Sequence, residues 1–345
     1  MPLAIKSYFK EAIKRDASDL HLVGEELPLL RLEGELKELE NKPIANKELE
    51  TAIRGMISKE QQEKYDQEKE LDFGYELDGT RFRINLHQQE GKIGLTARLI
   101  PAEIPSPDDL HFEPGLTEFS KLLDGLILVT GPTGCGKSTS IASMIEEINK
   151  SRKSHIITIE DPIEFMFKDK KSLIEQREVG SDTKSFANAL KYVLRQDPNV
   201  IFVGEMRDPE TIATVLTAAE TGHLVFSTLH TSSAAEAIER IVDVFDGAKQ
   251  KQILIQLSAA LRAIVAQQLL PSKDGGRVPA REILINTPAV ANLIRENNIS
   301  QIKSVIQTGS KEGMVSMENS LKQLMKEGWI TEEVAENRMG SRKKV

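Results

Sequence analysis

Residues 131–138 carry the strongest chemical signal in the chain, because their types and spacing fit a phosphate-binding loop. The segment GPTGCGKS matches the pattern G-x-x-x-x-G-K-[ST] at every specified position. Glycines let the backbone turn tightly and aim N–H groups at phosphate oxygens, while a following helix brings its positive end to the same place. We therefore expect a nucleotide site that comprises Gly131, Pro132, Thr133, Gly134, Cys135, Gly136, Lys137, Ser138 and Thr139.

Two side chains of this loop have expected chemical roles. Lys137 would reach the β- and γ-phosphates, and the Ser138 hydroxyl would be a ligand of Mg²⁺. A second ligand is expected at Glu205, because it follows the apolar run VIFV at residues 200–203. A carboxylate at the end of such a strand can hold the ion directly or through water.

Three more carboxylates lie within residues 160–164 (EDPIE), after the apolar run at residues 156–159. Nucleotide hydrolysis needs a group that orients or deprotonates the attacking water, and a carboxylate near the γ-phosphate can do so. We take Glu164 as the candidate for this role. The alternative is a solvated acidic turn.

Histidines and arginines supply further candidates. His223 and His230 flank one apolar strand, and His230 stands at its carboxyl end, where it could sense the γ-phosphate by hydrogen bonding. A structural histidine is the alternative, and metal binding is not expected because no Cys or His partner lies at ligand spacing. Arg81 and Arg83 share one face of a predicted strand. Spacing alone leaves open whether they neutralise transition-state charge or form surface salt bridges.

Two other arginines are further candidates, because Arg207 is close in sequence to Glu205 and Arg240 lies in the helix predicted after the histidine strand. Cys135 lies inside the loop near a helix N-terminus, an environment that lowers the pKa of a thiol. We therefore predict that alkylation of Cys135 blocks nucleotide binding and that ATP protects the thiol.

The elements around these residues alternate between strand and helix. Strands are predicted at 126–130, 155–160, 200–203 and 224–228, and helices near 138–150, 185–195, 208–220 and 233–244. This alternation predicts an α/β domain with a largely parallel sheet, whose ligand crevice lies at the carboxyl ends of the strands. After residue 271 we expect a mostly helical region, with helices at 288–296, 299–308 and 317–327 and a basic tail, GSRKKV.

The first hundred residues predict a smaller α+β domain. Helices are expected at 1–14, 47–56 and 59–68, strands at 18–23, 71–75, 80–88 and 93–99, and a hairpin within 27–39 that turns near Glu33 and Gly34. Prolines at 101, 105 and 107 indicate a linker. The expected domains are 1–99, a linker at 100–110, a P-loop core at 111–271 and a C-terminal helical region at 272–345.

Composition narrows the function class. The formal charge of −8 over 345 residues argues against a broad, sequence-independent grip on nucleic acid or anionic lipid. No apolar run approaches the roughly 20 residues that span a bilayer, and the N-terminus lacks a signal-peptide block, so we expect a cytosolic protein. A single cysteine excludes an intrachain disulfide and a Cys₄ zinc site.

Taken together, the motifs resemble those of the PilT-type ATPases, the retraction motors of bacterial type IV pili, within the secretion-ATPase superfamily. The matching stretches span nearly the whole chain: SDLHL at 18–22, GPTGCGKST at 131–139, TIEDPIEF at 158–165, VGSDT at 179–183, RQDP at 195–198, VGEMRDP at 203–209 and residues 217–235. The resemblance implies a PAS-like N-terminal domain joined to a RecA-like motor domain. It also implies a homohexameric ring that binds ATP and Mg²⁺ between subunits and hydrolyses ATP.

The resemblance also implies roles for individual residues. Glu164 matches the catalytic glutamate of the family's Asp box, and His223 and His230 mark its His box. Arg81 and Arg83 match arginine fingers that act across the subunit interface. The expected catalytic set is therefore Glu164, Glu205, His230, Arg81 and Arg83.

The expected function is type IV pilus retraction, which powers twitching motility. The motor would work on an inner-membrane platform protein, at the cytoplasmic face of that membrane, without a nucleic-acid partner. One departure concerns residues 287–296, which resemble the family's AIRNLIRE motif, linked to retraction, but carry Ala291 where the motif has arginine.

Several alternatives stay open at this point. An accessory retraction ATPase of the PilU kind fits the same motifs. Pilus-assembly and type II secretion ATPases usually carry an extra N-terminal domain and a tetracysteine zinc insert, for which this chain has neither room nor cysteines. From other classes, a non-hydrolysing scaffold is opposed by the combination of Lys137, Glu164 and Glu205, and a DNA-translocating motor is opposed by the acidic charge.

Overall fold

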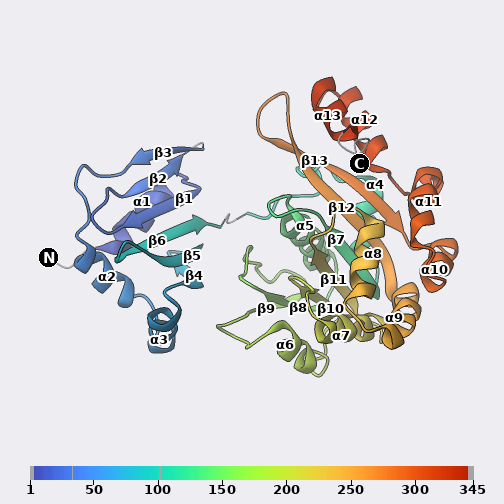
Figure 1. Ribbon diagram of the computed structural model, residues 1–345, viewed down its shortest axis with the longest axis horizontal. Helices are drawn as coiled ribbons and strands as arrows, with labels where there is room; N and C mark the ends of the chain where they lie inside the picture. Colours follow the sequence, from blue (N-terminus) through green and yellow to red (C-terminus); the bar gives the residue numbers. More distant parts are fainter. Residues whose placement is uncertain (1–3, 33, 101–102, 341–345) are drawn as a thin grey trace. The chain divides into compact units, whose positions relative to one another are not determined.

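The computed structural model describes residues 4–32, 34–100 and 103–340, and the chain groups into two compact units (Figure 1). The first unit comprises Met1–Glu103 together with the short segment Pro162–Met166. The second comprises Ile104–Asp161 and Phe167–Val345. The expected linker therefore falls at the boundary of the two units, while the segment that contains Glu164 groups with the first.

The first unit contains an antiparallel sheet with the strand order β3-β2-β1-β6-β5-β4. Its strands are β1 (Asp19–Val23), β2 (Leu29–Leu32), β3 (Glu35–Glu38), β4 (Leu71–Leu77), β5 (Thr80–Gln89) and β6 (Lys92–Leu99). Its helices are α1 (Ile5–Lys14), α2 (Asn46–Arg54) and α3 (Lys59–Glu68). This is the α+β architecture predicted for the N-terminal region.

One face of this sheet packs against the helices. Along β5 the buried side chains Phe82 and Ile84 alternate with the half-buried Arg81 and Arg83, because successive residues of a strand point to opposite faces. The ring of Phe9, on the apolar face of α1, meets Phe82 edge-on with centroids 4.9 Å apart. The arginines therefore lie on the face of the sheet that does not form this core.

The second unit contains a seven-stranded sheet with the order β13-β12-β7-β11-β10-β8-β9. Its strands are β7 (Gly125–Thr130), β8 (His155–Glu160), β9 (Leu173–Glu178), β10 (Val200–Val203), β11 (Leu224–Leu229), β12 (Leu261–Pro271) and β13 (Arg277–Ile285). All neighbouring pairs are parallel except the antiparallel pair β12–β13. Every residue of β7, β10 and β11 is buried, as parallel strands covered on both faces require.

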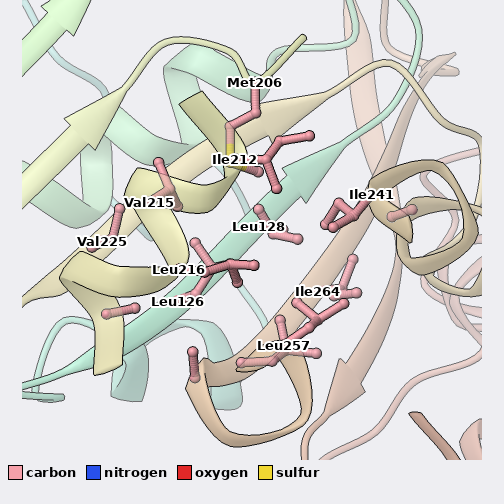
Figure 2. Close-up of a cluster of buried hydrophobic side chains, with 14 of the residues drawn as sticks. Leu126, Leu128, Met206, Ile212, Val215, Leu216, Val225, Ile241, Leu257 and Ile264 are labelled. Carbon is pink, nitrogen blue, oxygen red and sulfur yellow. The ribbon is translucent and has the colours of Figure 1, made fainter. Parts of the chain in front are cut away.

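Helices cover both faces of this second sheet. Leu126 and Leu128 of β7 point to one face and pack in a cluster with residues of several helices, among them Val215, Ile241 and Leu257 (Figure 2). Ile127, between them, points to the other face and packs with residues of α5. The helices of the unit are α4 (Pro114–Phe119), α5 (Lys137–Ser151), α6 (Phe186–Val193), α7 (Pro209–Glu220), α8 (Ala234–Asp243), α9 (Gly247–Ala260), α10 (Pro288–Arg295), α11 (Ile302–Thr308), α12 (Met317–Lys326) and α13 (Glu332–Gly340), with 3₁₀ turns η1 (Ile299–Gln301) and η2 (Ser310–Glu312).

The four strands predicted around the motifs are present as β7, β8, β10 and β11. The sequence prediction missed the strands β9, β12 and β13 and the helices α4, α9 and α13. The expectation of a helical region directly after residue 271 is wrong at its start, because β13 pairs with β12 along residues 277–285. The helix α9 runs into β12 without a Gly or Pro, so the apolar pattern gave no sign of the change.

Some predictions fall on residues that lie outside the described ranges. These are the first three residues of the predicted helix 1–14, the turn residue Glu33, the linker residues Pro101 and Ala102, and tail residues 341–345. Within residues 4–32, 34–100 and 103–340, no helix combines the length and apolarity needed to cross a bilayer.

Candidate active site

The phosphate-binding loop connects β7 to α5. Its glycines at 131, 134 and 136 have φ values of +147°, +76° and +84°, which residues with a side chain rarely adopt. At Gly131 a Cβ atom would also come within 2.2 Å of the backbone oxygen of Gln267. The loop therefore needs glycine for its backbone conformation and, at residue 131, for its close contact with β12.

Lys137 lies at the start of α5 and folds back over the loop. Its side chain is buried, and the ammonium group donates hydrogen bonds to the carbonyl oxygens of Gly131 (2.9 Å) and Pro132 (3.1 Å). Ser138 and Thr139 follow in the first turn of the helix, where unpaired backbone N–H groups and the helix dipole attract anions. The loop thus places a cation, two hydroxyls and a helix N-terminus together.

Glu205 and His230 meet beside this loop because they follow the neighbouring strands β10 and β11. Atom Oε2 of Glu205 lies 2.7 Å from Nε of Arg207 and 3.5 Å from Nε2 of His230. The strand ends are fixed by Thr228, whose hydroxyl donates to the carbonyl of Gly204 at 2.5 Å. The structure therefore brings together two residues that are 25 positions apart in the sequence.

The protonation state of His230 follows from its surroundings. Burial lowers the pKa of the imidazole, the charges of Lys137 and Arg207 lower it further, and Glu205 offsets part of this effect. The net shift is downward from the ordinary value near 6.5, so His230 is neutral at pH 7. A neutral ring can donate one hydrogen bond and accept another.

His223, at the opposite end of β11, has a structural partner. Its Nδ1 lies 2.9 Å from the carbonyl oxygen of Ala218, near the end of α7. The two histidines of the motif therefore occupy different environments, and His230 is the one on the side of the P-loop.

Two adjoining cavities of 560 and 490 Å³ run along the loop. They share Thr133, His230, Thr231 and Glu236 in their walls, so they form one continuous groove. The charged residues that line the groove are Glu205, Arg207, Glu236, Arg240, Arg277 and Arg338. Four arginines against two glutamates suit an anionic ligand such as a polyphosphate.

The donor set also fits Mg²⁺. The Ser138 hydroxyl and the Glu205 carboxylate are oxygen ligands of the kind that this ion uses together with phosphate oxygens and water. Within the described ranges, no group of three or more His, Cys, Asp and Glu side chains could hold a metal ion by itself. This arrangement suits an ion that binds with its nucleotide.

Three predicted site residues belong to the other unit. Glu164 is half-buried in the segment Pro162–Met166, and Arg81 and Arg83 lie on β5. The P-loop, Glu205 and His230 belong to the second unit. The roles of Glu164, Arg81 and Arg83 therefore stay predictions.

The expectation of an activated thiol at Cys135 is wrong. The side chain is only 3% exposed, and burial raises the pKa of the thiol even though Lys137 and backbone N–H groups act in the opposite direction. The Sγ atom lies beneath the loop, 2.6 Å from the point that a Cβ of Gly131 would occupy. The helix N-terminus is nearby, as predicted, but loss of solvent has the larger effect.

Glu160, the first of the three predicted carboxylates, ends β8 and accepts hydrogen bonds from Thr158 (2.7 Å) and Gln176 (3.3 Å). Sequence reasoning missed two buried polar residues beneath the loop. Gln267 on β12 and Arg281 on β13 lie beneath the loop, and the Gln267 amide donates to the carbonyl of Cys135 at 2.6 Å. A polar residue inside an apolar strand run, as in AIVAQQLL at 263–270, is a signal that could have identified Gln267.

Known proteins resemble this chain along nearly its whole length. Residues 2–336 match the family of type II/IV secretion system proteins. The chain is 44% identical to the type IV pilus retraction ATPase PilT of Pseudomonas aeruginosa over 93% of this chain and 94% of that protein. It is 47% identical to a twitching motility protein of Neisseria gonorrhoeae over 90% of this chain and 84% of that protein. A crystal structure of the pilus retraction motor PilT with bound ADP superposes with a TM-score of 0.90, at 47% identity, over 97% of this chain and 96% of that one.

Proposed function

This chain belongs to the type II/IV secretion system protein family, and from that membership we propose that it is an ATPase motor that drives the retraction of type IV pili. The observation that carries the proposal is the match to the Pseudomonas retraction ATPase, which covers more than nine-tenths of both chains. The resemblance to PilT-type ATPases and the RecA-like fold predicted from the sequence are confirmed by the same matches.

Nucleotide binding follows from the geometry of the second unit. The loop backbone and the first turn of α5 would bind the phosphates of ATP, and Lys137 would neutralise the β- and γ-phosphates. Mg²⁺, held by Ser138 and Glu205, would supply further positive charge at the transferred phosphoryl group. The neutral His230 beside Glu205 would donate a hydrogen bond to a phosphate oxygen.

The hydrolytic step is assigned to Glu164. Its carboxylate would orient the attacking water, and Arg81 and Arg83 would neutralise charge in the site of a neighbouring subunit. This assignment implies the homohexamer expected from the family, with ATP between subunits. The division into domains 1–99, 111–271 and 272–345 is part of the same proposal, since hydrolysis would move the first against the others.

The partner is proposed to be the inner-membrane platform protein of the pilus, contacted from the cytoplasmic face. Residues 287–296 would contribute through α10, where the side chains of Val290 and Ile294 are buried and anchor the helix. Ala291, on this helix, replaces the arginine of the family motif. We therefore expect this helix to contribute less to retraction than a helix that carries the arginine of the family motif. ATP hydrolysis should be unaffected.

The decisive experiment deletes the gene in its source organism and counts surface pili by electron microscopy. Complementation with wild type should restore motility, whereas Glu164→Gln should not. Glu239→Gln, an exposed glutamate of α8, is the matched control and should complement fully. Excess pili on non-twitching cells would support a retraction motor.

The other outcomes identify the alternatives. Bald cells would indicate an assembly motor and overturn the proposal. Unchanged pili would indicate an accessory motor or a different secretion system. With purified protein, phosphate release that persists without DNA and disappears in Glu164→Gln would exclude both the scaffold and the DNA-dependent motor.

A further inference from the structure

The side chain of Gln267 connects the P-loop to the edge of the second sheet. It is 2% exposed and makes three hydrogen bonds. Its Nε2 donates to the carbonyl oxygen of Cys135 at 2.6 Å. Its Oε1 accepts from the Ser140 hydroxyl in α5 and from Nε of Arg281, each at 2.9 Å.

Arg281 fixes which way the Gln267 amide faces. The two residues are directly opposite in the β12–β13 ladder, and the guanidinium has donors but no acceptor. A carbonyl such as that of Cys135 can only accept. With the amide reversed, both contacts would fail, so this orientation is the one that satisfies every partner.

Arg281 is in turn held by the chain that precedes α4. Its terminal nitrogens donate to the carbonyls of Leu110 (2.8 Å) and His111 (2.9 Å) and to the carboxylate of Glu113 (3.0 Å). The guanidinium also lies 5.0 Å from the centre of the Phe112 ring. A charge that is 1% exposed needs such partners, so the arginine is locked in one position.

The contact with Cys135 determines where a loop N–H group points. In a trans peptide the C=O and the next N–H point in opposite directions. Because Gln267 binds the Cys135 carbonyl, the N–H of Gly136 points away from β12. The backbone conformation this needs at Gly136 has φ +84°, and a Cβ there would come within 3.0 Å of Gln267 Nε2.

We propose that Gln267 is a positioning residue of the nucleotide site and that Arg281 acts through it. Gln267 holds the peptide between Cys135 and Gly136 in the orientation that binds phosphate, and Arg281 keeps the Gln267 amide in the orientation that allows this. This inference rests on the proposed function only in assuming that the P-loop binds ATP.

Two substitutions at Gln267 separate positioning from stability. Gln267→Glu keeps acceptors for Arg281 and Ser140 but loses the donor to Cys135. Gln267→Met has nearly the same shape but loses all three hydrogen bonds. The measurements on the full-length protein are the Kd of a fluorescent ATP analogue, the KM and kcat of phosphate release, and the melting temperature.

We expect both variants to raise the Kd and KM about tenfold, with a smaller change in kcat, because a loop N–H contacts phosphate in the bound ground state as well as in the transition state. The melting temperature should fall in Gln267→Met alone.

If the Kd rises only in the variant with the lowered melting temperature, Gln267 is merely structural. If the Kd rises only in Gln267→Glu, charge repulsion is the cause. Either result overturns the proposal, whereas a wild-type protein that does not bind the analogue would overturn the proposed function instead.

The role of Arg281 is tested by a double-mutant cycle. Arg281→Lys keeps the charge, but one ammonium cannot reach Gln267, Glu113 and two carbonyls together. We expect Arg281→Lys to raise the Kd at least threefold by itself and to add nothing in the Gln267→Met background. Additive effects would show that Arg281 acts independently of Gln267 and would overturn that half of the proposal.

Discussion

The two sheets of this protein differ in how they bury their residues. In β5 of the first unit, Phe82 and Ile84 are buried while Arg83 between them is half-exposed. In β7 of the second unit, Ile127 and Leu128 are both fully buried, in clusters on opposite faces of the sheet. A sheet with one core face carries polar side chains along its whole length, whereas a sheet buried on both faces leaves them mainly at its strand ends.

This difference explains where the chemistry lies. Lys137, Glu205 and His230 follow the ends of parallel strands, so the backbone of the second sheet fixes their spacing. Arg81 and Arg83 lie on β5, on the face of the first sheet that does not form its core, where a residue can act only on something that approaches that face. The strand ends of the second sheet therefore form a binding site by themselves, whereas the arginines of the first sheet form a surface that needs a partner.

The largest expected effect concerns this contrast between site and surface. Lys137→Ala should lower ATP hydrolysis by about 10³-fold and weaken nucleotide binding, because it removes the cation from the loop. Arg83→Ala should lower kcat by about tenfold or more while the Kd for the ATP analogue stays near that of wild type. Steady-state kinetics and fluorescence titration measure both. An Arg83→Ala protein that loses binding as severely as Lys137→Ala would break the distinction.

The next effect concerns stability on the two faces of each sheet. Ile127→Ala and Leu128→Ala should each lower the free energy of unfolding by about 2–5 kcal/mol, since both leave cavities in a core. In the first sheet Ile84→Ala should cost a similar amount, but its neighbour Asn85→Ala less than about 1 kcal/mol. Urea denaturation followed by circular dichroism gives these values. Equal costs at residues 84 and 85 would mean that the first sheet is also buried on both faces.

The third prediction concerns a charge inside the first sheet. Burial raises the pKa of Asp19, but hydrogen bonds from Arg98 and Ser18 lower it by more, so the net pKa is below its ordinary value. A carboxylate with a depressed pKa contributes stability above the unfolded pKa, about 3.9, and loses it as the pH falls through the folded pKa. We expect Asp19→Asn to lower the free energy of unfolding at pH 7 by about 1.5 kcal/mol.

Unfolding measured between pH 7 and pH 3 tests this prediction. The stability difference between wild type and Asp19→Asn should shrink below about pH 4, where the wild-type carboxylate takes up its proton. A difference that is constant across this range would show that the ion pairs of Asp19 with Arg31 and Arg98 add no net stability.

The sequence predicted the parts of the site that are local along the chain. The P-loop, Glu205 and His230 each follow an apolar run, and such runs show both the strand and its carboxyl end. Glu164 was a candidate because its acidic segment follows an apolar run, whereas Arg81 and Arg83 were assigned catalytic roles through a family resemblance. These three residues belong to the first unit, and the P-loop belongs to the second.

The two residues beneath the P-loop, Gln267 and Arg281, could not be predicted in the same way. Gln267 and Arg281 reach the loop only because β12 pairs in parallel with β7 and antiparallel with β13. Long-range pairings of this kind leave no local pattern. The change from α9 to β12 was also hidden, since both segments are apolar and no Gly or Pro separates them. The position of Cys135 near a helix N-terminus predicted a reactive thiol. The prediction failed because burial raises the pKa of this thiol, and its burial depends on how the loop folds.

The smallest expected effect is a difference in reaction rate between two thiols, one in each unit. Cys135 should react with N-ethylmaleimide at least about tenfold more slowly than the thiol introduced by Lys37→Cys on the exposed strand β3, because burial raises the pKa of Cys135 and blocks access to it. Peptide mass spectrometry of one doubly labelled protein gives both rates. ATP should slow the reaction at residue 135 further and leave residue 37 unchanged, since the loop must open for the reagent to enter. Comparable rates at the two residues would mean that the loop opens readily in solution, and the hydrogen bond from Gln267 to Cys135 would then be too weak to hold it.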